Sequence, residues 1–132
     1  MDTPLSAERI EELLWPYRAE LARWPLYVSL DKDVMVPADA AVNWDSGHLD
    51  LAEVGLILDT FRDLAKGRLA GVDVVGDWSP VHVQGWFRQL LHLTEHPALT
   101  EDPAVARRCN ERTNLALLAA FGAERPAARV AA

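Results

Sequence analysis

Cysteine is nearly missing from this chain, which has Cys109 as the single one among its 132 residues. One cysteine excludes an internal disulfide and any motif of paired cysteines, and it agrees with a reducing compartment. Also missing are an apolar run of the 18 or more residues that span a membrane and, at the N-terminus, the basic and apolar regions of a signal peptide. We therefore expect a cytoplasmic protein that binds no membrane.

Basic residues are scarce relative to acidic ones, because 13 Lys and Arg face 20 Asp and Glu and leave a net charge of −7. The acidic excess lies in residues 1–80, which carry 15 acidic against 7 basic residues, whereas residues 81–132 carry 5 against 6. A negative field repels phosphate backbones, so we expect no binding to nucleic acid. The same negative field is compatible with the basic surface of a partner protein.

Hydrophobic residues make up half of the chain, which is enough for one domain with a core, while the length is too short for two. We predict a single globular domain over residues 1–122 and a disordered tail over residues 123–132.

Apolar residues at helical spacing predict the first two helices. The first covers about 6–23 and kinks at Pro16, with two separate helices as the alternative. Its apolar face consists of Ile10, Leu13, Leu14, Tyr17, Leu21 and Trp24. The second begins at a capping box of Asp50 and Glu53 and ends near Arg68.

Two further helices are predicted over 79–97 and 102–122, because each begins with a capping residue followed by proline. Alternating apolar residues over 26–30 and 34–36 predict a β-hairpin, and 72–75 predicts a third short strand. The expected fold class is α+β and mainly helical, with about four α-helices and a small antiparallel hairpin or three-stranded sheet. An all-α bundle is the alternative.

The last predicted helix is apolar on every side from Leu115 to Phe121. Its inward face is predicted to contain Val105, Cys109, Ala116, Leu117 and Ala120. Because Leu115 and Leu118 lie away from that face, the hairpin, the C-terminal tail or a second molecule must cover them. We expect a homodimer with both leucines in or beside the interface.

Five of the residues are tryptophans, and two of them stand outside the predicted core. Trp15 lies off the apolar face of the first helix, and Trp44 lies in the loop after the hairpin. Exposed tryptophans are enriched at protein interfaces, so both are candidate interaction residues. The alternative is that both pack under loops.

His92, Glu95 and His96 match the H-x-x-E-H pattern and in these five residues resemble the inverted zinc peptidases. The resemblance implies that His92 and His96 ligate zinc and that Glu95 activates water. The alternative is that the histidines face solvent.

Asp31 and Asp33 follow an apolar strand in the segment LYVSLDKDV, which resembles the opening motif of haloacid dehalogenase-like phosphatases. The resemblance implies that Asp31 is the nucleophile and Asp33 the acid/base. Asp and Asn are also common turn residues, which is the alternative reading of both. A further group of possible metal ligands lies in the loop from Asp45 to Asp50, which includes His48.

These patterns supply no coherent catalytic set, so we expect a small acidic protein-interaction module without enzymatic activity, of the adaptor, immunity or regulatory-subunit type. The alternative is a small metal-binding protein or metal-dependent hydrolase that binds zinc or another divalent ion through His92, Glu95 and His96 or through the Asp45–Asp50 loop.

Overall fold

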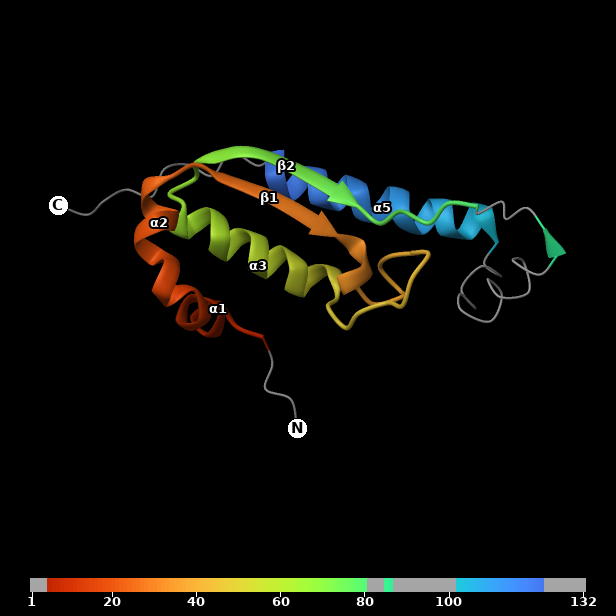
Figure 1. The fold of residues 1–132 in the computed structure, drawn as a ribbon, viewed down its shortest axis with the longest axis horizontal. Helices are drawn as coiled ribbons and strands as arrows, with labels where there is room; N and C mark the ends of the chain where they lie inside the picture. The colour runs from red at the N-terminus through yellow and green to blue at the C-terminus, as the bar shows by residue number, and fades with distance from the viewer. Residues whose placement is uncertain (1–4, 81–84, 87–101, 123–132) are drawn as a thin grey trace.

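The computed structural model describes residues 5–80, 85–86 and 102–122. Figure 1 shows their arrangement, in which the two strands lie side by side and the long helices α3 and α5 run along them. In chain order the elements are α1 (Ala7–Leu14), the 3-10 turn η1 (Trp15–Tyr17), α2 (Arg18–Arg23), β1 (Leu26–Asp31), the 3-10 turn η2 (Lys32–Val34), α3 (Leu51–Leu64), β2 (Leu69–Val75) and α5 (Pro103–Gly122). The fold is α+β and mainly helical.

The sheet has two parallel strands in the described part of the chain, with Val28 opposite Val72 and Leu30 opposite Val74. The prediction of an antiparallel hairpin or a three-stranded sheet is therefore wrong. After β1 the side chain of Asp31 accepts a hydrogen bond from the backbone N–H of Asp33 and starts the η2 turn. Because η2 does not lead the chain back along β1, no hairpin forms. The strand β1 pairs instead with β2, and α3 forms the crossover that parallel strands require.

The first helical stretch is divided into two helices, α1 and α2, by η1, which contains Pro16. This is the alternative of two separate helices and not one kinked helix over about 6–23. Ser6 caps α1 by accepting from the N–H of Arg9. The predicted core face is wrong in part, however. Ile10 is buried and Leu14 half-buried, whereas Leu13, Tyr17 and Trp24 are about three-fifths exposed.

The main core lies between one face of the sheet and helices α3 and α5. Its buried residues are Met35, Ala40, Val42, Val54, Leu58 and Leu117, with Val28, Leu30 and Val74 of the strands packed against them. Helix α3 begins with the predicted capping box, in which Asp50 and Glu53 each accept from the other's backbone N–H. Arg62 of α3 donates to the carbonyl of Ala120 over 2.7 Å and so ties α3 to the end of α5.

Helix α5 begins at Pro103, after Asp102 has accepted a hydrogen bond from the N–H of Ala104, as predicted. Its buried face was predicted only in part. Leu117 is buried as predicted, whereas Val105 is half-exposed and the other buried residues are Ala106, Asn110 and Thr113. Asn110 and Thr113 are polar, but both bond to the backbone of the loop at residues 38–42. A hydropathy pattern does not show that a polar side chain will have buried hydrogen-bond partners.

The helix predicted over 79–97 and the tail over 123–132 fall mainly outside the described residues, so these predictions stay predictions. The same holds for the single domain over 1–122. No helix in the described ranges is long and apolar enough to cross a membrane.

Candidate functional site

An apolar groove lies where the first helical stretch meets β1 and α3. It has a volume of about 350 Å³ and is lined by Leu14, Tyr17, Glu20, Leu21, Trp24, Pro25, Leu26 and Phe61. Seven of these eight residues are hydrophobic or proline. The groove contains the same face of the first helix that the sequence assigns to the core, so an apolar helix face here remains open to solvent.

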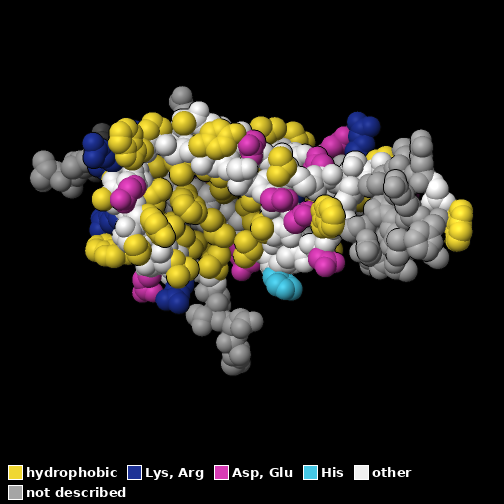
Figure 2. Space-filling model, viewed as in Figure 1, with side chains coloured by type: hydrophobic (Ala, Val, Ile, Leu, Met, Phe, Trp, Pro, Cys, Tyr) yellow, Lys and Arg dark blue, Asp and Glu magenta, His cyan; other side chains and the backbone are white. Residues whose placement is uncertain are grey.

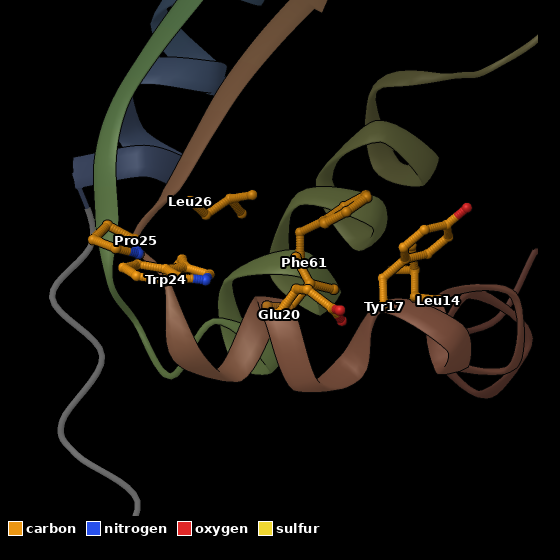
Figure 3. A pocket seen from close by; sticks show the side chains of 8 residues that line it. Leu14, Tyr17, Glu20, Trp24, Pro25, Leu26 and Phe61 are labelled. Atoms are coloured by element: carbon orange, nitrogen blue, oxygen red, sulfur yellow. The ribbon is translucent and has the colours of Figure 1, made fainter.

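Figure 3 shows how the walls of the groove are arranged. Phe61 reaches in from α3, between Trp24 at one end and Tyr17 with Leu14 at the other, and Leu26 lies on the side of β1. In Figure 2 the hydrophobic side chains gather in one broad patch over this part of the molecule. Aromatic rings that are this exposed and this close together are typical of interaction surfaces.

The groove is held in shape by contacts at the corner between α2 and β1. The guanidinium of Arg68 donates to the carbonyl of Ala22, and the N–H of Leu26 donates to the carbonyl of Arg68 over 2.8 Å. The first contact joins the end of α2, and the second the start of β1, to Arg68, the residue before β2. The groove is therefore a preformed feature of the fold rather than a gap beside a loose helix.

One charged residue, Glu20, lines the groove, and two arginines stack on tryptophans near it. Arg23 stacks over Trp24 and Arg18 over Trp15, each at 5.0 Å from the ring centroid. Such cation–π contacts restrict the indole rings without covering the apolar groove.

The four candidate interaction residues are all exposed, but they do not form one surface. Trp15 lies in η1 beside the groove without lining it, and Trp44 lies in the loop before α3. Leu115 and Leu118 lie on α5, and each is 67% exposed. Trp24 and Phe61 line the groove but were missed as site residues, because their helical periodicity reads as core. The sequence carries no signal that shows whether another element covers such a face.

A second, polar site lies at the carboxyl ends of the two parallel strands. Asp31 ends β1, Asp33 follows in η2, and Gly76 follows β2 and packs against both. One carboxylate oxygen of Asp33, Oδ1, is buried without a hydrogen-bond partner. Burial, and then the charge of Asp31, raises the pKa of Asp33.

The same end of the sheet has a fully buried lysine. The ammonium of Lys32 pairs with Asp77 and donates to Oδ1 of Asn114 over 3.1 Å, so it joins η2, the segment after β2 and helix α5. Burial lowers the pKa of Lys32. Because its nitrogen already has two partners and no exposed surface, Lys32 acts as a structural tie.

The metal site proposed for the Asp45–Asp50 loop is not supported by the described residues. Asp50 caps α3, and Asp45 and His48 are exposed in the preceding loop. In the described ranges no three His, Cys, Asp or Glu side chains come close enough to hold a metal ion. His92, Glu95 and His96 lie outside those ranges.

Comparison with protein-family models, with curated proteins and with solved structures finds no match for the chain.

Proposed function

We propose that the protein is an interaction module that binds a partner protein through the apolar groove of α1, α2, β1 and α3. The observation that carries this proposal is the open aromatic wall formed by Tyr17, Trp24 and Phe61. Burying aromatic side chains at the centre of an interface supplies most of the binding energy in many complexes.

The fitting partner element is an amphipathic helix or a strand with apolar anchors. The groove extends from Leu14, the last residue of α1, along η1 and α2. A helix placed in it would set side chains at positions i, i+3 and i+4 against Tyr17, Phe61 and Trp24. The net charge of −7 favours a partner whose surface around the anchors is basic.

Site-specific photo-crosslinking tests the proposal in living cells. We replace Tyr17 with p-benzoylphenylalanine, and for the control we replace Arg108, which is exposed on α5. The expected result is one dominant adduct with a particular protein at position 17 and none at position 108. No adduct at 17, or the same adducts at both positions, contradicts the proposal.

Affinity measurements with the purified partner then test how much the aromatic wall contributes to binding. Trp24→Ala should weaken binding by at least about 2 kcal/mol, roughly 30-fold, if Trp24 is an anchor residue. Trp86→Ala, which removes another exposed indole away from the groove, should leave the affinity unchanged.

A second candidate function is divalent cation binding at the carboxyl ends of β1 and β2. The observation that favours it is the unpartnered Oδ1 of Asp33 next to Asp31. Ligands of open parallel sheets bind at the carboxyl ends of the strands. Two carboxylates with water as the remaining ligands are a common arrangement for Mg²⁺.

Calorimetric titration with Mg²⁺ and Mn²⁺ tests this candidate. Binding that raises the melting temperature and is lost in Asp33→Asn, but retained in Asp45→Asn, supports a site at the end of β1. Loss in Asp45→Asn alone would place the ion in the Asp45–Asp50 loop, and no binding to the wild-type chain rules out both.

A further inference from the structure

Among the described residues, the free edge of β2 is a second open surface. In the described part of the chain β2 pairs with β1 alone, so backbone N–H and C=O groups along its other edge have no strand beside them. Natural proteins protect such edges with proline, lysine or other charges. The β2 sequence LAGVDVV has neither proline nor lysine, and its one charged residue, Asp73, leans toward β1 to accept from Tyr27 and Ser29.

A second apolar groove runs beside this edge. It has a volume of about 330 Å³ between β2 and α5 and is lined by Val72, Val74, Asn114, Leu117, Leu118 and Phe121. Leu115 and Leu118 extend its apolar surface along α5. A strand added next to β2 would direct every second side chain into this groove.

The charge of the chain indicates which partner fits the groove beside β2. Residues 115–122 of α5 carry no charge at all in a chain with a net charge of −7. The net negative charge makes two copies repel one another, but residues 115–122 add no charge to that repulsion. In a two-fold dimer the same patch of both copies meets at the interface, and an uncharged patch does not repel its own copy.

We propose that β2 pairs antiparallel with β2 of a second copy, so that the two sheets become one four-stranded sheet and the α5 helices meet through Leu115 and Leu118. The register follows from charge. A two-fold axis at Val72 places Asp73 opposite Gly71 of the second copy, whereas an axis at Asp73 would bring two carboxylates face to face. This surface is separate from the groove at Tyr17 and Trp24, so the dimer leaves that groove open.

Sedimentation equilibrium at micromolar concentration tests the assembly. The wild-type chain should have twice the monomer mass, and Leu118→Glu should have the monomer mass with an unchanged far-ultraviolet circular dichroism spectrum. Val105→Glu, which places the same charge at an exposed apolar position near the start of α5, should remain a dimer. A monomeric wild-type chain, or a dimer that tolerates Leu118→Glu, overturns the proposal.

Disulfide trapping tests the register, in a Cys109→Ala background that removes the native thiol. Directly opposite residues of an antiparallel pair have Cα atoms about 4.5–5.5 Å apart, which a disulfide can span. Val72→Cys should therefore form a covalent dimer on mild oxidation, and Val75→Cys, which would lie opposite Leu69, should not. Equal trapping at both positions, or none at 72, overturns the strand pairing. Neither result affects crosslinking at Tyr17, so this proposal and the proposed function fail separately.

Discussion

At the scale of single residues, Gly76 fixes the geometry at the carboxyl end of β2. Its φ angle is 92°, and a Cβ atom there would lie 2.6 Å from Oδ1 of Asp31 and 3.0 Å from the N of Lys32. We expect Gly76→Ala to lower the free energy of unfolding by about 1–3 kcal/mol through strain and displacement of the η2 turn. Urea unfolding measures this change.

The matched control is Gly55→Ala on α3, where a Cβ meets nothing within 4 Å. Alanine is the better helix former, so this variant should gain roughly 0.5–1 kcal/mol. The same small effect from both substitutions would show that the backbone at Gly76 is not constrained in this way.

The open face of the sheet contains a pair of coupled titrating groups. The hydroxyl of Ser29 donates to Asp73 over 2.6 Å and that of Tyr27 over 2.8 Å, and these two hydrogen bonds lower the pKa of Asp73. The carboxylate raises the pKa of Tyr27 in turn. We predict that Ser29→Ala raises the pKa of Asp73, as measured by its carboxyl carbon shift in an NMR pH titration.

The effect on stability has a definite sign. Since the pKa of Asp73 is lower in the folded than in the unfolded chain, its contribution is present above the unfolded pKa and is lost as the pH falls through the folded one. Ser29→Ala should therefore lose less stability on acidification than the wild type. Asp73→Asn should lower the pKa of Tyr27, and an unchanged Tyr27 titration would show that the two side chains do not interact in solution.

At the scale of elements, α5 is fixed to the loop after η2 by polar side chains. Oδ1 of Asn110 accepts from the N–H of Ala41 over 3.0 Å, and its Nδ2 donates to the carbonyl of Ala41 over 2.8 Å. Both partners are buried, and each buried group left unpaired costs about 1–3 kcal/mol. We expect Asn110→Ala to destabilise the protein by about 2 kcal/mol or more in urea unfolding.

Arg108→Ala is the control for this element, because Arg108 is exposed on the same helix, and its effect should stay within about 0.5 kcal/mol. If both variants unfold at the same urea concentration, the loop is not held by Asn110.

The element boundaries were largely predictable, because they depend on local chemistry. The capping box at Asp50, the Asp102 cap and the break at Pro16 involve contacts within one helical turn or a residue's own ring. The pairing of β1 with β2 was not predictable in this way. It joins segments separated by an entire helix, and neither strand's sequence states whether its neighbour runs parallel or antiparallel.

The candidate site was predicted even less well, for a related reason. Periodicity shows which residues share a helix face, but not whether another element covers that face. The face with Tyr17 and Trp24 therefore read as core and is instead the wall of a groove. On α5 the opposite error occurred, since the polar Asn110 and Thr113 are buried.

At the scale of the whole molecule, a parallel sheet of two strands is an unusual centre for a protein. Parallel sheets are normally covered on both faces, whereas here Tyr27, Ser29 and Asp31 are exposed on the face opposite the core. Both open grooves lie beside this sheet, one next to Leu26 and the other next to Val72 and Val74. The proposed partner and the proposed second copy would each cover apolar surface that the chain leaves open.

Leu117 of the main core can test whether the described elements unfold as one unit. Leu117 is 1% exposed and lies in the same cluster as Leu58 of α3 and Val28 of β1. If residues 1–122 form a single domain, truncation of Leu117 loosens α5, α3 and β1 together. Leu117→Ala should lower the free energy of unfolding by about 2–5 kcal/mol, and tryptophan fluorescence and far-ultraviolet circular dichroism should still report one coincident transition at a fixed protein concentration. Leu13→Ala removes a leucine that is exposed on α1, and it should change stability by no more than about 0.5 kcal/mol. Two separate transitions in the Leu117 variant, one for each probe, would mean that the first helical stretch and α5 belong to different cooperative units.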